Sequence, residues 1–306
     1  MKIETILAFT AMTVLPFCGR SQNINDLLNQ WNIVTSGDLK AVNDYSGSAY
    51  VGGNVTKSTS FDVGKGVSNP NTVSLAVAGN IVSGSAINVD GGSVAVGGSA
   101  NGRNFNMNSS GTLTQGNPSL LPASPVDAIM AASLSWSTLT PNSSISLSSS
   151  ALNLNCGSGD LAVFNVSAAD LFVNNKDLHL VLSSGTKDVI INVSGDTMNT
   201  GNSKFTSLQA MDEHVIFNFY QATSVDFGSE SYGYVVAPGA DVTSDNNFNG
   251  GIMAKSLSAG EVHLAPWEGD VPSSSVPEPT TWFAGASTLG MLGFGLFRQR
   301  KEQKTQ

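Results

Sequence analysis

The sequence has 306 residues and a net charge of −9 at neutral pH, with 41% hydrophobic residues against 12% charged ones. This balance excludes an intrinsically disordered chain, which combines low hydrophobicity with high net charge. It also excludes nucleic-acid binding through a basic surface, because the net charge has the same sign as phosphate. The 32 glycines are typical of a β protein with many tight turns, where glycine adopts positive φ without steric cost.

The first segment, residues 1–20, has the pattern of a secretory signal peptide. Lys2 precedes an apolar run that ends at Leu15, and this run is too short for a stable transmembrane helix. Cleavage is expected between Phe17 and Gln22. Cys18 raises the alternative of a lipoprotein, which the preceding Leu-Pro-Phe fits poorly. We therefore expect an exported protein.

The other end carries three features in order. A linker over 271–279 contains Val276, Pro277, Glu278 and Pro279, an apolar stretch covers 280–297, and the basic tail 298–306 includes Arg298, Arg300 and Lys301. Eighteen helical residues span about 27 Å, which is just short of a hydrocarbon core of about 30 Å. The basic residues are expected to stay on the cytoplasmic side, leaving the body outside.

Taken together, these three features resemble the PEP-CTERM sorting signal of Gram-negative bacteria. The resemblance implies that an exosortase recognises the Pro-Glu-Pro segment and removes the apolar helix after export. The membrane would then be a transient partner. The alternative is an ordinary single-pass anchor that is retained.

Between the two ends, the body has few basic residues. Residues 21–279 hold eight of them against 21 acidic residues, a net charge near −13. Such a surface resists self-association and attracts divalent cations. Because Cys156 is the body's single cysteine, no disulfide can form within it, and its stability must come from packing.

The body begins with an internal repeat. A short apolar strand followed by a Gly-Gly or Gly-Asn turn occurs at 49–55, 75–81 and 94–100. The anchors Val51, Val77 and Val96 lie 26 and 19 residues apart, within the range of one solenoid coil. Such a strand cannot bury its inner face alone, so the coils are expected to stack.

Further strands are predicted after an interruption. Runs rich in Val, Ile and Phe and bounded by Gly, Asn and Ser occupy 161–166, 178–182, 189–193, 214–219, 234–237 and 251–254. Their nearly continuous apolar character is typical of parallel strands covered on both sides. We predict a mainly β fold, a stacked β-solenoid spanning 24–270.

The interruption itself predicts a helix over 125–139. Ser124 and Pro125 provide a start signal, and Thr140-Pro141 an end signal. Val126, Ile129, Met130 and Leu134 are expected to form its buried face against the solenoid. The serine-rich segment 142–150 is interpreted as a loop or an edge strand.

The order of these segments resembles the choice-of-anchor A domain of bacterial surface proteins. The resemblance covers about 240 residues, from Ile24 to Gly269, and rests on 39–55, 73–97, 189–195 and 215–267. It implies an adhesive, non-catalytic surface role and supplies no catalytic or binding residues. Because this family occurs with alternative anchors, PEP-CTERM among them, the body and the tail support each other.

One segment suggests a metal site. Residues 245–250 read D-x-N-x-N-G, and Asp245, Asn247 and Asn249, with Asp241 nearby, are candidate calcium ligands. The twelfth position is Ser256 rather than glutamate, which excludes an EF-hand. The alternative is a solvated turn between coils. No other cofactor is expected.

Enzymatic alternatives have weaker support. His179, His214 and His263 lack zinc-ligand spacing, and Cys156 has no visible base partner. A polysaccharide-acting enzyme would need carboxylates gathered in one cleft, for which Asp188, Asp196, Asp212 and Glu213 are the available candidates.

Two further surface interpretations are weak. Ice binding requires regular threonine rows, which the repeats do not show. The tryptophans, Trp31, Trp136 and Trp267, do not recur at coil spacing and are expected in the core rather than on a glycan platform. We expect exopolysaccharide or surface proteins as partners, contacted weakly and many times by flat sheet faces and polar turns.

Overall fold

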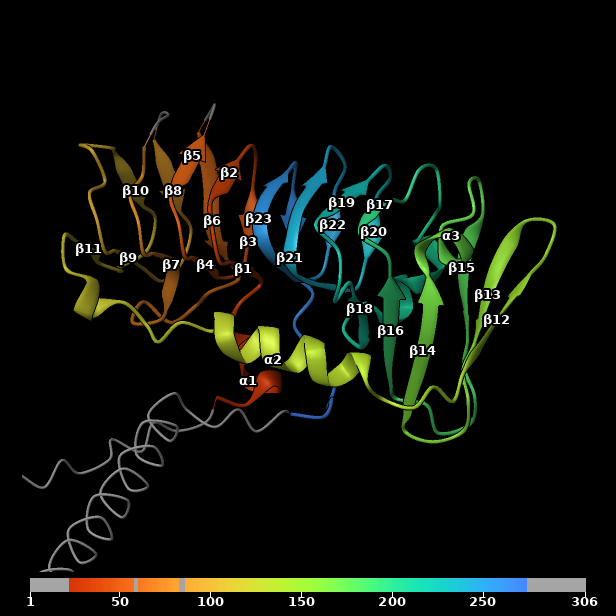
Figure 1. The fold of residues 1–306 in the computed structure, drawn as a ribbon. Helices are drawn as coiled ribbons and strands as arrows, with labels where there is room; N and C mark the ends of the chain where they lie inside the picture. Colours follow the sequence, from red (N-terminus) through yellow and green to blue (C-terminus); the bar gives the residue numbers. More distant parts are fainter. Residues whose placement is uncertain (1–21, 58–59, 83–85, 274–306) are drawn as a thin grey trace, which may run out of the picture. The chain divides into compact units, whose positions relative to one another are not determined.

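The computed structural model describes residues 22–57, 60–82 and 86–273. The predicted signal peptide, the sorting motif, the apolar stretch 280–297 and the basic tail lie outside these residues. Within them the structure is mainly β, with three sheets of 14, 7 and 3 strands (Figure 1). Every pairing in the two larger sheets is parallel, which confirms the predicted coil stacking.

The 14-stranded sheet, here sheet A, contains one wall of the solenoid along its whole length. In spatial order this path is β11 (Leu113–Gln115), β9 (Ser93–Val96), β7 (Val73–Val77), β4 (Ala49–Val51), β1 (Ile33–Thr35), β23 (Ile252–Ala259), β21 (Tyr234–Ser244), β18 (Val215–Asn218), β16 (Asp188–Ser194) and β14 (Leu161–Ser167). Four strands extend it around a corner: β2 (Leu39–Ala41), β5 (Val55–Lys57), β17 (Thr197–Asn199) and β19 (Ser224–Phe227).

The other two sheets complete the coils. The seven-stranded sheet B runs β10 (Phe105–Met107), β8 (Ile87–Val89), β6 (Phe61–Lys65), β3 (Tyr45–Ser46), β24 (Val262–His263), β22 (Phe248–Asn249) and β20 (Ser231–Tyr232). The three-stranded sheet C consists of β12 (Ser144–Leu147), β13 (Ala151–Asn155) and β15 (Asp177–Val181). β12 is the edge strand allowed for by the sequence, and it pairs with β13 antiparallel.

The coils do not stack in chain order. The N-terminal coils run outward from β1 to β11, and the C-terminal coils return from β14 to β23, which pairs with β1 in the middle of the stack. The chain crosses between the two ends of the stack through α2 (Val126–Ser137), which lies along sheet A beside α1 (Ile24–Gln30) (Figure 1). The remaining helical turns are α3 (Ala168–Leu171) and two 3₁₀ segments, Pro118–Leu120 and Thr206–Met211.

The predicted Gly-Asn turns form a column along the N-terminal coils. The amide of Gly79 donates to the carbonyl of Gly53 at 2.9 Å, and the amide of Gly98 donates to that of Gly79 at 3.0 Å. A Cβ on Gly79 would lie 2.5 Å from the Gly53 carbonyl oxygen, so only glycine allows this approach. Beside them, Asn54 Oδ1 accepts from the amide of Asn80 at 2.9 Å, repeating the contact one coil further on. These hydrogen bonds between successive coils explain why Gly and Asn recur at the same position of each repeat.

Two apolar cores lie on opposite sides of sheet A. The first fills the solenoid interior and includes Phe164, Phe217 and Phe227. The second lies between sheet A and the two helices and includes Trp31, Trp136 and Trp267, as predicted for the tryptophans. Among the described residues, the two cores draw on side chains from Ile24 to Val271, and residues 22–274 form one compact unit, so this body carries a core of its own.

The predicted buried face of the helix was partly wrong. α2 buries Ile129, Ala132, Ser133 and Trp136, spaced i, i+3, i+4 and i+7, whereas Met130 and Leu134 are 44% and 58% exposed. The face is set by a polar network as well as by apolar packing. Asn218 is fully buried, donates to the Ser133 carbonyl at 2.9 Å and accepts from its hydroxyl at 2.6 Å. The spacing of hydrophobic residues along the helix does not predict these hydrogen bonds between Asn218 and Ser133.

Candidate functional site

One part of sheet A is not covered by any described helix. It consists of β17, β19, the second halves of β21 and β23, β2 and β5, and its outward side chains stand in register on neighbouring strands. One row is Thr197, Ser224, Asp241 and Ser256, and the other is Asn199, Asp226, Thr243, Ser258, Lys40 and Thr56. These ten side chains are exposed or half-buried and are called the hydroxyl face below.

The strands hold this face rigidly because the alternate residues are core residues. Met198, Val225, Val242 and Leu257 lie between the outward residues and are at most 1% exposed. Neighbouring strands are about 4.8 Å apart, so the first row presents a polar group on each of four strands and the second row on each of six. The face is therefore a flat, regularly spaced surface.

The charges on the hydroxyl face are largely compensated. Asp226 accepts from Asn199 Nδ2 at 2.9 Å and from Thr243 Oγ1 at 2.8 Å. Asp241 accepts from Ser256 Oγ at 2.7 Å and pairs with Lys255 at 3.2 Å. The hydrogen bond from Ser256, and after it the Lys255 charge, lower the pKa of Asp241. With Lys40 in the second row, the face offers hydroxyl and amide groups rather than a strong field.

Sheet B presents a different outward surface. Asn106 donates to Asn88 at 2.7 Å and Asn88 donates to Asp62, and the row continues to Asp44 and Glu261. We call these five side chains the acidic face. Burial, and then repulsion from Asp62 and Glu261, raise the pKa of Asp44. Three adjacent carboxylates make this face repulsive to an anionic partner.

The residues of the predicted calcium loop are distributed over a corner of one coil. Asp241 lies on β21 in the hydroxyl face, Asp245 and Asn247 follow that strand, and Asn249 lies on β22 in sheet B. Asp241 is bonded to Ser256 as described above. Asn249 donates to Glu230 at 2.9 Å and its Oδ1 lies 2.9 Å from His263 Nδ1.

The three histidines each contact a carboxylate of the protein. His214 Nδ1 lies 2.9 Å from Asp188, His263 Nε2 lies 3.1 Å from Glu261, and His179 Nε2 lies 3.4 Å from Asp177. Across the described residues, no three His, Cys, Asp or Glu side chains form a metal-binding group. Cys156 is half-buried, and burial raises its pKa to about 11, so its thiol is protonated at neutral pH.

The carboxylates considered for an enzyme are divided between the two ends of β16. Asp188 begins this strand, is 5% exposed, and accepts from the amide of Asp270 at 3.1 Å, so it fixes the C-terminal segment. Asp196 follows its other end, after more than about 20 Å of strand. A glycosidase pair is separated by about 5–9.5 Å. Asp212 and Glu213 precede His214 near Asp188, and burial, followed by Glu213, raises the pKa of Asp212.

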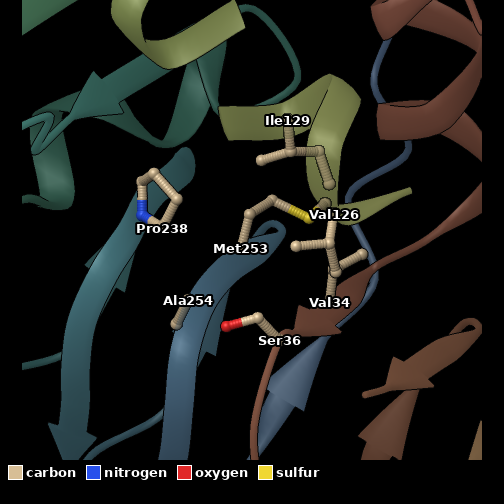
Figure 2. A pocket seen from close by; sticks show the side chains of 7 residues that line it. All are labelled: Val34, Ser36, Val126, Ile129, Pro238, Met253 and Ala254. Carbon is tan, nitrogen blue, oxygen red and sulfur yellow. The ribbon is translucent and has the colours of Figure 1, made fainter. Parts of the chain in front are cut away.

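A small apolar hollow lies where α2 begins over sheet A (Figure 2). It is lined by Val34, Val126, Ile129 and Met253, with Ser36, Pro238 and Ala254 at its edge. Its free volume of about 10 Å³ is close to the minimum for a single water. It is a packing gap beneath the helix rather than a ligand site.

The sorting motif, Val276 to Pro279, and the basic residues Arg298, Arg300 and Lys301 lie outside the described residues. The described chain ends beside α1 and α2, where Ser273 Oγ donates to Asn23 at 3.0 Å and Trp136 Nε1 donates to the Pro272 carbonyl at 2.9 Å. No helix among the described residues has both the length and the apolar character needed to cross a bilayer.

Comparison with known proteins identifies a family for most of the chain. Neither the curated proteins nor the solved structures gave a match to the chain. A protein-family model described as "Putative Ice-binding-like adhesive domain" matches residues 24–264, which is nearly the whole solenoid. The match supports an adhesive surface or extracellular protein with a non-enzymatic role. The chain therefore belongs to this family of ice-binding-like adhesive domains.

Proposed function

We propose that the protein is an exported, non-catalytic adhesive module that contacts matrix polysaccharide through its hydroxyl face. The observation that carries this proposal is the register of ten polar or charged side chains over six neighbouring strands that no described helix covers. Each contact with a sugar hydroxyl is weak. Repetition along the face, and display of many copies, raise the avidity.

The choice of this face over the acidic face follows from charge. Matrix polysaccharides that carry acidic groups are repelled by Asp62, Asp44 and Glu261; after burial, the charges of Asp62 and Glu261 raise the pKa of Asp44. At the hydroxyl face Lys255 pairs with Asp241, and Lys40 adds a positive charge to the row that contains Asp226. The hydroxyl face is therefore the surface on which an acidic or a neutral polysaccharide meets the smaller electrostatic cost.

Cosedimentation tests the proposal. The chain from 22 to 273 is mixed with exopolysaccharide from the source cells, and the supernatant is assayed for released reducing ends. We expect retention without release. A triple variant with Thr56→Ala, Thr197→Ala and Thr243→Ala should lose most of the retention, whereas the control Met130→Ala with Leu134→Ala on α2 should keep it. Release of sugars would show an enzyme instead.

The same experiment separates a calcium-dependent adhesin from a metal-independent one. Retention that disappears in EDTA and returns with calcium would assign Asp241, Asp245, Asn247 and Asn249 to a cation site. Asp245→Ala should then abolish the calcium effect. Retention unchanged in EDTA is the outcome expected if the loop is a solvated turn.

We further propose that the C-terminal segment sorts the protein through an exosortase. The described body ends at Ser273, three residues before Val276, on the side that carries α1 and α2. Display from this end would leave the hydroxyl face free. Pro277→Ala with Pro279→Ala should retain the uncleaved, membrane-associated form in the source cells, detected by fractionation and mass. Normal processing of this variant would contradict the sorting proposal.

A further inference from the structure

A separate hollow of about 480 Å³ lies beside sheet C, at the end of the stack formed by the coils after α2. This volume is within the range of small-molecule sites, about 300–1,000 Å³. Six of its seven lining residues have polar or charged side chains: Ser149, Ser150, Asn175, Asp177, His179 and Lys204. We call it the sheet C pocket.

The backbone fixes the charged groups of this pocket relative to one another. Asp177 and His179 are two residues apart on β15 and so lie on the same side of the sheet. Lys204 forms a parallel bridge with Asp177, and its carbonyl accepts from the amide of Leu178 at 2.8 Å. This wall of the pocket is therefore strand β15 with the backbone of Lys204 hydrogen-bonded to it.

The pocket places a lysine next to an aspartate on an acidic body. Lys204 is exposed, and within the described chain its ammonium group takes part in no ion pair. Lys176 holds the rim by donating to the carbonyls of Ser148 and Ser149. Two of the body's eight basic residues thus flank one hollow on a body with a net charge near −13. An anionic group is better accommodated here than on the acidic face.

The remaining groups of the pocket suit hydroxyls. Asp177 accepts from Ser207 Oγ at 3.0 Å through Oδ2 and lies 3.4 Å from His179. Oδ2 is the oxygen that a ligand hydroxyl can reach, because Oδ1 has almost no accessible surface while the Asp177 side chain as a whole is 27% exposed. Asn175 and the two serines supply both donors and acceptors. A ligand that matches these groups carries several hydroxyls and one carboxylate.

We propose that the sheet C pocket binds a uronic acid residue of an acidic polysaccharide, with the sugar carboxylate on Lys204 and its hydroxyls on Asp177 and Asn175. This inference rests on the proposed adhesive function and adds a substrate class to it. The pocket would give specificity for acidic polysaccharide, and the hydroxyl face would add extended contact that is less selective.

Calorimetric titration of the chain from 22 to 273 tests this inference with tri-galacturonic acid as the probe. The control ligand is the fully methyl-esterified trisaccharide, which has the same rings without the charge. We expect binding of the acid only, about tenfold weaker in Lys204→Gln, which corresponds to the loss of about 1.4 kcal/mol. Lys65→Gln, which removes an exposed lysine from β6 in the other half of the stack, should bind normally.

Several outcomes would overturn the proposal that this pocket binds a uronic acid. These are equal binding of both trisaccharides, no binding of either, or full affinity in Lys204→Gln and in Asp177→Asn. Free galacturonic acid in a competing arm distinguishes a monosaccharide site from one that needs the polymer. Matrix cosedimentation that persists unchanged in Lys204→Gln and is not inhibited by tri-galacturonic acid would contradict the pocket proposal and leave the adhesive function intact. Binding of the trisaccharide without matrix retention would support the pocket and contradict the adhesive function.

Discussion

The two halves of β21 show how one strand takes part in two different surfaces. In the first half, Val235 and Ala237 face the solenoid interior while Tyr234 and Val236 face the helices. In the second half, Ala240 and Val242 still face the interior, but Asp241 and Thr243 face solvent. The pairing with β23 shifts register between Ala237 and Asp241, where the coil turns its corner.

The inward residues of a coil therefore form the solenoid core. The polarity of the outward residues determines whether that wall is covered by helices or exposed to solvent. β23 repeats the pattern, with Met253 beneath the helices and Ser258 on the hydroxyl face. A run that is apolar in both alternate positions indicates a covered wall. A run that alternates strictly indicates a wall that is free to bind.

The largest expected effect comes from placing a charge on the covered half. Met253→Asp buries an unpaired carboxylate at a site with 0% exposure, and we expect a loss of at least about 5 kcal/mol. Ser258→Asp on the same strand, beside Lys40, should change the free energy of unfolding by less than about 0.5 kcal/mol. Urea denaturation of both variants measures the difference. Equal destabilisation by both variants would contradict the distinction between the covered and the exposed half of β23.

The two sides of α2 give the next largest contrast. Trp136→Ala removes a fully buried side chain and its bond to Pro272, and we expect a loss of about 3–5 kcal/mol. Leu134→Ala, on the exposed side of the same helix, should cost less than about 0.5 kcal/mol. Thermal unfolding followed by circular dichroism compares them. A large loss from Leu134→Ala would restore the buried face predicted from the sequence.

The same contrast between covered and exposed surfaces applies to amide side chains. Asn218→Ala leaves Ser133 and Asn192 without their partner beneath the helix, which we expect to cost about 1–3 kcal/mol. Asn106→Ala on the acidic face exposes its partner Asn88 only to water, and its effect should be within about 0.5 kcal/mol. Chemical denaturation distinguishes them, and a neutral Asn218→Ala would show that the network does not hold α2.

The smallest expected effect is pH-dependent and belongs to the acidic face. The raised pKa of Asp44 means that its charged form costs stability above that pKa, and the cost disappears as the pH falls and the folded state takes up the proton. Asp44→Asn should therefore raise the free energy of unfolding at neutral pH, by less than about 0.5 kcal/mol because water screens an exposed group, and urea denaturation at neutral and acidic pH measures this gain. The gain should vanish in acid. A gain that grows as the pH falls would contradict this sign.

Local pattern predicted the coils because each strand and turn carries its own signal. The apolar runs and the Gly-Asn turns lie within single coils, and the structure confirms that Val51, Val77 and Val96 stack in register. Coil order was not predictable in this way, since β1 pairs with a strand more than 200 residues later. The pattern of a strand does not identify its distant neighbour.

The candidate surface was missed for the same reason. The outward residues at 197–199, 224–226 and 241–243 show the polar–apolar alternation of a half-buried strand, which was a usable signal. They become one face only when three coils are placed side by side, and Lys40 joins them from the other half of the chain. The sheet C pocket likewise needs Lys204 beside Asp177, which only the bridge between them reveals.

The most direct test of the adhesive surface blocks one face at a time. Thr243→Cys on the hydroxyl face and Leu134→Cys on α2 can each be labelled with a polyethylene-glycol maleimide at neutral pH, in a chain that carries Cys156→Ala so that the introduced cysteine is the body's single thiol. Retention of the labelled proteins on matrix exopolysaccharide is then compared. If the hydroxyl face is the adhesive surface, the label at position 243 abolishes retention and the label at position 134 does not. Retention lost only with the label on α2 would contradict it.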